Sequence, residues 1–331
     1  SGYTIALKDK DFKKVFYLPM DSSTNAKKLL DIIKPTLVLW VKYEYWYYHL
    51  SEIKRRNIPL LLISGIFRND QVFFKWYGSL YRKMLQTFTH FFVQNASSKN
   101  QLQILIAEEK ITISGDTRCD RVINIAENFT EVAGIANYCG NNKVVVAGST
   151  WEDDQAEWTH FVKIHPEIKF IIAPHEIDEE NLNDVKKEFE GSILYSEYLN
   201  GSNEDFANAH CMIIDNIGTL SRLYKYATIA YVGGGFGYNG LHNILEPAVY
   251  GKPVIFGPEF EKNFEAVDLI ECSGAIDIEN ALELEKAMNN LLNEKGEIER
   301  RGMAAKNYVY KHAGASEKII DFIQKNRLLT N

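Results

Sequence analysis

Residues 229–258 read IAYVGGGFGYNGLHNILEPAVYGKPVIFGP and form the most informative stretch of the chain. The apolar run Ile229–Val232 ends in three glycines, which would let the backbone approach a phosphate closely at the carboxyl end of a strand. Asn243 and Glu246 follow at a predicted helix start, three residues apart and so on one helical face. A carboxylate there suits paired ribose hydroxyls. The structural alternative is a glycine turn in which Glu246 only complements the helix dipole.

In the rest of the chain, short apolar runs alternate with amphipathic stretches such as 25–33 and 97–107. The runs are too short for helices and do not alternate, as expected for strands buried on both faces. The repeated strand–helix order predicts an α/β fold with parallel sheets, arranged as two facing Rossmann-like domains. The runs lie at 15–18, 36–40, 60–64, 91–94 and 111–114 in the first half, and at 143–147, 169–173, 211–214, 229–232 and 253–256 in the second.

The predicted domain boundaries follow the same pattern. Residues 1–125 form a first Rossmann-like domain, 126–141 a linker, 142–310 a second domain that binds the nucleotide, and 311–331 a C-terminal helix. The apolar residues of that last helix would pack either on the first domain or on the second. They are Ile319, Ile320, Phe322 and Ile323.

Three more loops come at the predicted ends of strands in the second half. They are 148–150 (Gly-Ser-Thr), 174–176 (Pro-His-Glu) and 215–218 (Asp-Asn-Ile-Gly), the last of which is expected to start a helix. Each alone fits an ordinary helix-capping turn. Because ligands of doubly wound sheets bind at the carboxyl ends of the strands, four such loops together predict one ligand site.

Composition and charge exclude several classes of structure and function. The chain has 331 residues, 46% of them hydrophobic, and it has no run near the about 20 apolar residues of a membrane span. Its four cysteines are widely spaced, which argues against a disulfide framework or a structural zinc site. Residues 1–120 hold 18 Lys and Arg against 11 Asp and Glu, and the remainder holds 19 against 33. A basic first half predicts an anionic partner there, while the acidic second half argues against nucleic acid.

Residues 67–92 combine aromatic residues at helical spacing with several cations. One interpretation is a core helix with a solvated basic edge. The other is an interfacial helix that touches anionic lipid. The cations assigned to this side of the protein are Arg56, Arg68, Lys75, Arg82 and Lys83.

Five strings of the second half resemble the 3-deoxy-D-manno-octulosonic acid (Kdo) transferases, which are glycosyltransferases of the two-Rossmann (GT-B) kind. They are GSTWEDD, IIAPHEID, DNIGTLSRLY, YVGGGFGYNGLHNILEP and FGPEFEKNF. In the first half, FYLPMDSSTNAKKLLDIIKP and VKYEYWYYHL are also similar to that family. The resemblance implies inverting, metal-independent transfer of Kdo from CMP-Kdo to a lipid A precursor, in lipopolysaccharide biosynthesis. It implies no cofactor, and a peripheral location at the cytoplasmic face of the bacterial inner membrane.

The resemblance also assigns roles to residues of the second half. Pro174 and His175 would lie near the cytidine, Ile217 and Gly218 would offer backbone contacts, Asn243 would contact the phosphate and Glu246 the ribose. The complete predicted donor set is Ser149, Thr150, Pro174, His175, Ile217, Gly218, Gly234, Gly240, His242, Asn243 and Glu246.

Two departures from the family pattern bear on catalysis. His175 stands where the family often has Arg, which affects neutralisation of the donor phosphate. The family also has an N-terminal anchor and a first βαβ unit with a Gly-Glu motif, whose Glu is the general base, and no such string precedes Ser1. The first domain is therefore expected to be incomplete. The expectation is a chain that binds CMP but transfers Kdo poorly. Glu44 is a candidate substitute base, but a structural role is favoured for it.

Two alternatives remain open at this point. One is another GT-B enzyme that uses a UDP-sugar, either a transferase or an epimerase. The other is a nucleotide-binding protein without catalytic activity. Nucleotide competition separates the first alternative, because UDP would then bind better than CMP.

Overall fold

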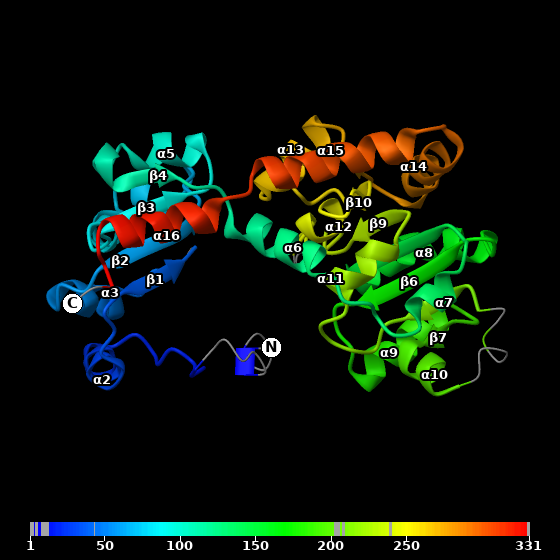
Figure 1. The fold of residues 1–331 in the computed structure, drawn as a ribbon, viewed down its shortest axis with the longest axis horizontal. Helices are drawn as coiled ribbons and strands as arrows, with labels where there is room; N and C mark the ends of the chain where they lie inside the picture. Colours follow the sequence, from blue (N-terminus) through cyan, green and yellow to red (C-terminus); the bar gives the residue numbers. More distant parts are fainter. Residues whose placement is uncertain are drawn as a thin grey trace. The chain divides into compact units, whose positions relative to one another are not determined.

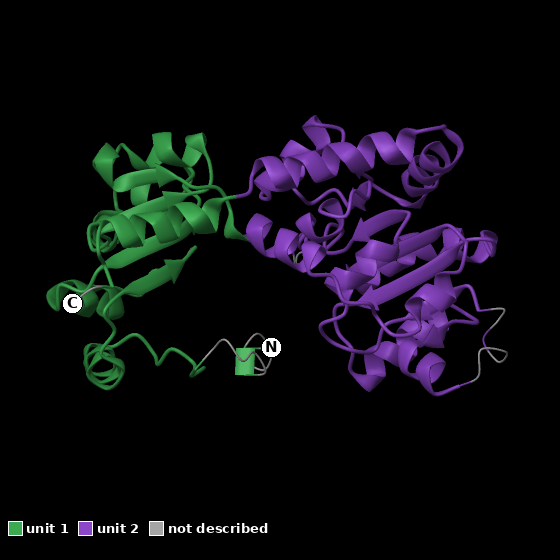
Figure 2. Ribbon diagram, viewed as in Figure 1, with its two compact units in different colours: residues 1–117, 314–331 green, residues 118–313 purple. Residues whose placement is uncertain are grey.

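The computed structural model describes residues 3, 6, 7, 13–42, 44–201, 206, 209–237 and 240–329. The chain folds into two compact units, residues 1–117 with 314–331 and residues 118–313 (Figures 1 and 2). Each unit is built on a parallel sheet, which confirms the α/β fold class. The chain passes from one unit to the other at Thr117 and again at Ala313.

The sheet of unit 1 has four parallel strands in the order β1-β2-β3-β4. Capping side chains fix two of its helices, because Ser22 accepts from the Asn25 N–H before α2 and Asn95 accepts from the Ser98 N–H before α5. The elements are α2 (Ser23–Ile33), β1 (Val38–Val41), α3 (Tyr47–Arg55), β2 (Leu60–Gly65), the 3₁₀ turn η1 (Val72–Phe74), α4 (Ser79–Leu85), β3 (His90–Val93), α5 (Ala96–Leu102), η2 (Glu108–Lys110), β4 (Ile111–Ile113) and α16 (Ala315–Lys325).

Both faces of this sheet are covered. One face, with Leu60, Leu62 and Phe91, packs against apolar residues of α3, α4 and α5. The other face buries Leu61, Ile63 and Phe92 beneath Ile319 and Ile323 of α16. Figure 1 shows α16, in red, lying across the strands of unit 1. The C-terminal helix therefore belongs to the core of the first unit.

The sheet of unit 2 has seven parallel strands in the order β11-β10-β9-β5-β6-β8-β7. Its apolar faces pack against helices on both sides, as the unbroken apolar runs require. The elements are α6 (Thr117–Glu127), α7 (Ile135–Cys139), β5 (Val144–Thr150), α8 (Glu152–Ile164), β6 (Lys169–Pro174), α9 (Glu179–Glu188), β7 (Ile193–Leu194), α10 (Tyr195–Asn200), β8 (Cys211–Ile213), α11 (Leu220–Leu223), η3 (Tyr224–Tyr226), β9 (Ile229–Val232), α12 (Leu245–Ala248), β10 (Val254–Phe256), α13 (Phe264–Glu271), β11 (Ala275–Asp277), α14 (Ala281–Asn293) and α15 (Glu297–Lys311).

Four sequence expectations differ from the structure. Residues 15–18 form no strand, and 126–141 is no linker, because α7 packs Ile135 and Tyr138 into the core of unit 2. Residues 67–92 do not form one helix: η1 and α4 are separated by a turn at 75–78. The chain after β8 runs through a bend before α11 begins at Leu220, so residues 215–218 do not start a helix directly.

Candidate functional site

The four predicted loops lie side by side at one edge of the unit 2 sheet. They follow β9, β5, β6 and β8, which are consecutive neighbours in the sheet order. Between β9 and β5 the order of strands reverses, because β6 and β8 extend to one side of β5 while β10 and β11 extend from β9 to the other. Such a switch point opens a crevice at the carboxyl ends of the strands. The glycine-rich loop after β9 and the Gly-Ser-Thr end of β5 border that crevice.

Close backbone approach explains the glycines after β9. A Cβ at Gly233 would lie 2.4 Å from the Ser149 carbonyl oxygen, and a Cβ at Gly234 would lie 2.3 Å from the Gly240 carbonyl oxygen. The Gly233 N–H donates to the Gly148 carbonyl at 2.9 Å, and the Gly234 N–H donates to Asp154 Oδ2 at 2.8 Å. These two N–H groups therefore hold the loop in place, and in this conformation they are not free to bind a phosphate.

Asp154 is a fully buried carboxylate beneath the loop. Its oxygens accept hydrogen bonds from the Trp151 N–H at 2.9 Å, the Gly234 N–H and the Tyr231 hydroxyl at 2.6 Å. Burial raises the pKa of Asp154, while these three hydrogen bonds oppose the rise. From the sequence, Asp154 is recognised only as part of an acidic helix start. The side chain in fact joins β9, the glycine-rich loop and the first turn of α8.

Three rings stack above the same crevice. His175 stacks on both Trp151 and His242, with ring centroids 4.4 Å and 4.6 Å away, while Trp151 and His242 lie side by side with centroids 6.4 Å apart. The Trp151 Nε1–H donates to His242 Nε2 at 3.1 Å. Burial and the neighbouring His175 lower the pKa of His242 to about 4, so its ring is neutral at physiological pH and can accept that hydrogen bond. The exposed His175 ring is thus held by two others, and sequence reasoning assigned no role to Trp151.

Asn243 and Glu246 lie together, as their spacing predicts. Asn243 Nδ2 donates to Glu246 Oε1 at 3.2 Å, although α12 begins two residues after Asn243. Burial raises the pKa of Glu246, and both the Asn243 hydrogen bond and the charge of Arg121 oppose the rise. Glu246 lines a small crevice with Ser221, which follows the loop after β8. A carboxylate held in this way can accept hydrogen bonds from a ligand hydroxyl.

The remaining predicted donor residues lie in the same loops. Ser149, the next-to-last residue of β5, has a positive φ of 55°, and the carbonyl of the buried Thr150 accepts the His175 N–H at 2.9 Å. Pro174 is buried at the end of β6. Ile217 is 67% exposed, and Gly218 has a φ of 95° with open space around it.

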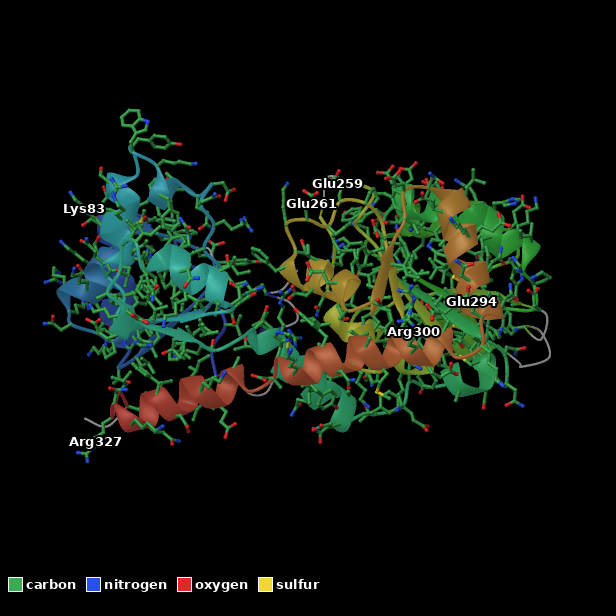
Figure 3. All side chains as sticks on the ribbon, turned by 90° about the horizontal axis from the view of Figure 1, so that it is seen from above. Lys83, Glu259, Glu261, Glu294, Arg300 and Arg327 are labelled. Carbon is green, nitrogen blue, oxygen red and sulfur yellow. The ribbon has the colours of Figure 1, made fainter. Side chains whose placement is uncertain are left out.

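An open pocket of about 530 Å³ adjoins Gly240. Its polar lining was not foreseen from the sequence and comprises Asp153, Glu259, Glu261, Lys262 and Asn263. Figure 3 labels Glu259 and Glu261, whose side chains come from the loop after β10. Within the described ranges, no group of three or more His, Cys, Asp or Glu side chains is arranged to hold a metal ion.

The predicted cations of unit 1 divide into two groups. Arg56 pairs with Glu52 and Asp31, both at 2.8 Å, and Arg68 lies 3.6 Å from Asp70. Arg82 donates to the backbone carbonyls of Phe73 and Lys75. These three arginines therefore have partners within the protein.

Lys75 and Lys83 make no ion pair with any residue that the structure describes. Glu44 is exposed and accepts the Trp46 indole N–H at 2.7 Å. In the part of the chain that the structure covers, no helix has the length and apolarity needed to cross a membrane.

Comparisons with known proteins agree with the sequence resemblance. Residues 1–121 match the family described as 3-deoxy-D-manno-octulosonic-acid transferase (kdotransferase). A bifunctional glycosyltransferase/methyltransferase of Fusobacterium nucleatum is 28% identical over 99% of this chain and 50% of its own length. The 3-deoxy-D-manno-octulosonic acid transferase of Haemophilus influenzae is 24% identical over 93% of this chain and 74% of its own length. The chain thus spans about half of the first relative and about three quarters of the second.

Solved structures confirm the fold. A UDP-GlcNAc 2-epimerase from Neisseria meningitidis, bound to UDP-GlcNAc, matches with a TM-score of 0.67 at 16% identity, over 94% of this chain and 86% of that one. At that identity the likeness establishes only a shared fold, the GT-B arrangement of two Rossmann-like domains. Together, these matches show that residues 1–121 are similar to the Kdo transferase family, that most of the chain is similar in sequence to a named Kdo transferase, and that the chain has the GT-B fold.

Proposed function

We propose that this protein transfers Kdo from CMP-Kdo to a lipid A precursor at the cytoplasmic face of the inner membrane, in lipopolysaccharide biosynthesis. The observation that carries the proposal is the constellation at the switch point of unit 2. There the glycine-rich loop, the three stacked rings and the Asn243–Glu246 pair meet at adjacent strand ends. Relatives from two bacteria that carry transferase names support the same function.

In the proposed reaction, an acceptor hydroxyl oxygen attacks the anomeric carbon of Kdo from the face opposite the phosphate. A new carbon–oxygen bond forms while the bond to the CMP phosphate breaks, and a base takes the hydroxyl proton. The configuration at the anomeric carbon is thereby inverted. CMP leaves as an anion, and we propose that neutral dipoles at strand and helix ends stabilise it without a metal or another cofactor.

Within this proposal, different donor-site residues contact different parts of CMP-Kdo. Glu246, positioned by Asn243, holds the ribose hydroxyls through its free oxygen. The exposed face of His175 contacts the base or the phosphate. Because the Gly233 and Gly234 N–H groups are already bonded, the phosphate would be held by other groups around the crevice, including Ser149 and Gly218.

Calorimetric titration with CMP, and with UDP as the control, tests the donor site. The expected result is a clear preference for CMP, and a loss of roughly 10- to 100-fold in affinity in Glu246→Ala, the range for losing hydrogen bonds to a charged group. Glu299→Ala, an exposed carboxylate on α15, is the matched control and should bind CMP as the wild type does. Preference for UDP would instead favour a UDP-sugar enzyme.

Transfer itself is tested with CMP-Kdo and a lipid A precursor, with and without a chelator. The proposal expects product of inverted anomeric configuration, formed slowly, as the sequence predicts, and at the same rate in the presence of EDTA. A rate that falls with EDTA and recovers on addition of a divalent cation would contradict the metal-independent mechanism.

A further inference from the structure

Unit 1 carries a turn of fixed shape at residues 75–78, hereafter the Trp76 turn. The Lys75 N–H donates to the Val72 carbonyl, the Gly78 N–H donates to the Lys75 carbonyl, and Arg82 donates to the Lys75 carbonyl at 2.9 Å from the side. A Cβ at Gly78 would lie 2.0 Å from the Val72 carbonyl oxygen, so glycine is required there. Backbone and side-chain contacts thus fix the direction of this turn.

The Trp76 turn presents aromatic rings to water. Trp76 is 90% exposed, the largest value among the large apolar side chains that the structure describes, and Tyr77 is 59% exposed. The two rings contact each other edge to face, with centroids 5.5 Å apart. Leu80 and Tyr81, in the first turn of α4, extend the exposed apolar surface. Holding such rings in water is unfavourable, so their fixed presentation points to a partner.

Cations predominate in the sequence around the turn. Residues 71–107 contain four Lys and Arg and no Asp or Glu, and of these four Lys99 pairs with Glu108 at 2.7 Å. Lys83 is exposed on α4, where Figure 3 shows it at the outer surface of unit 1. Lys54 adds a further cation, because its Nζ donates to the Gln86 carbonyl at the end of α4. An exposed aromatic pair close in sequence to Lys75 and Lys83 matches the interfacial layer of a membrane that carries anionic lipid.

We propose that the Trp76 turn is the part of unit 1 that enters a membrane surface. Trp76 and Tyr77 lie among the headgroups, and Lys75 and Lys83 contact anionic lipid. The inference rests on the proposed function only for the identity of the membrane. It also limits the lipid-contacting surface to one short turn, rather than the whole of the segment 67–92. The buried residues of that segment, such as Phe73 and Met84, belong to the core of unit 1 and cannot take part.

Vesicle binding of the full chain tests the proposal. The expected result is sedimentation with vesicles of phosphatidylcholine and phosphatidylglycerol, and much less with phosphatidylcholine alone. Trp76→Ala should lower the partition coefficient about tenfold or more, and Lys83→Ala about fivefold at low salt, as for one basic residue at an anionic surface. Leu282→Ala, at a position 79% exposed on α14, is the matched control and should not change binding.

A second measurement locates the ring itself. Brominated acyl chains should quench the tryptophan fluorescence of the wild-type protein. Trp76→Phe keeps an apolar ring but removes the fluorophore, so it should bind vesicles and lose most of that quenching. Absence of vesicle binding by the wild type, equal binding by Trp76→Ala, or equal quenching in Trp76→Phe would each overturn the proposal, and the first would favour a protein partner.

The outcome is separable from that of the donor site. CMP titration of Trp76→Ala is expected to match the wild type, because the change lies in unit 1. Vesicle binding that depends on Trp76 in a protein without CMP affinity would uphold the membrane inference and reject the proposed function. CMP binding in a protein that does not bind vesicles would reject the membrane inference and leave the proposed donor site standing.

Discussion

The two sheets carry the same unusual backbone feature at a strand end, and they use it differently. Ser64 at the end of β2 has a φ of 53°, Ser149 at the end of β5 has a φ of 55°, and the strand register shifts at both places. Ser64 is fully buried, and its hydroxyl lies 3.1 Å from the Thr117 hydroxyl. Ser149 is half-buried, and among the described residues its hydroxyl has no hydrogen-bond partner. One bulge is closed by protein side chains, and the other is left open at the crevice.

The largest difference between the two strand ends should come from their glycines. Gly233→Ala would place its Cβ 2.4 Å from a backbone oxygen of Ser149, which cannot move without shifting β5. Gly65→Ala in unit 1 would meet the end of the Leu62 side chain at 2.9 Å, which can turn away. We expect Gly233→Ala to abolish CMP binding and to cost about 1–3 kcal/mol of unfolding free energy.

Gly65→Ala should lower the free energy of unfolding by well under half of the loss expected for Gly233→Ala, and it should leave CMP affinity unchanged. Chemical denaturation and calorimetry of both variants measure this. Equal losses in the two variants would mean that the close approach in unit 2 is no more restrictive than its counterpart in unit 1.

Buried carboxylates should give the two units opposite responses to pH. Hydrogen bonds from Arg55 and then Arg56 outweigh burial and lower the pKa of Glu52 in unit 1 to about 2. Its stabilising contribution is therefore complete above the unfolded value near 4.5 and is lost as the pH falls through about 2. Burial raises the pKa of Asp154 in unit 2, so its contribution is complete below the unfolded value near 3.8 and is lost as the pH rises through the folded value.

The destabilisation caused by Glu52→Gln should accordingly shrink as the pH is lowered from 6 toward 2. That caused by Asp154→Asn should shrink as the pH is raised. Denaturant unfolding of the two variants at several pH values checks the signs, and parallel trends would refute the contrast.

Substitution of the two serines by glycine tests the comparison most directly. Glycine relieves the strain of a positive φ, worth about 1 kcal/mol. Ser149→Gly should therefore be more stable than the wild type and bind CMP more weakly, if its hydroxyl serves the ligand. Ser64→Gly loses the hydrogen bonds to Thr117, which offsets the gain, and should keep its CMP affinity. Denaturation and calorimetry read both effects, and unchanged CMP binding by Ser149→Gly would remove that residue from the donor site.

The smallest expected effect concerns the stacked rings. Trp151→Phe keeps an aromatic surface beside His175 but removes the N–H that donates to His242 Nε2. Because that bond favours the neutral imidazole, the pKa of His242 should rise above its present value of about 4. Titration followed by NMR of the histidine ring protons measures the shift. A pKa that stays the same would show that burial and His175 alone set it.

The fold and the grouping of the candidate loops follow largely from local sequence. Apolar runs too short for helices identified β1 to β6 and β8 to β10, and the Asn243–Glu246 spacing predicted their contact. The two-residue β7 and the strand β11 carry too little apolar pattern to be recognised. The prediction of one helix over 67–92 was wrong for a structural reason. Phe73 and Met84 are buried, as a helical stripe predicts, but a turn at 75–78 separates η1 from α4. Asp154 and Trp151 could not be found, because their partners are distant in the sequence.

The double crossing of the chain sets the order in which the protein can be completed during synthesis. Residues 118–313 form unit 2 from one continuous segment, whereas unit 1 needs α16 to cover Leu61, Ile63 and Phe92. A ribosome therefore finishes the whole of unit 2 before the helix that covers the first sheet emerges. Until then, one apolar face of that sheet is exposed to water and to chaperones. The sheet of unit 1 is thus translated before unit 2 but is covered only after unit 2 is complete.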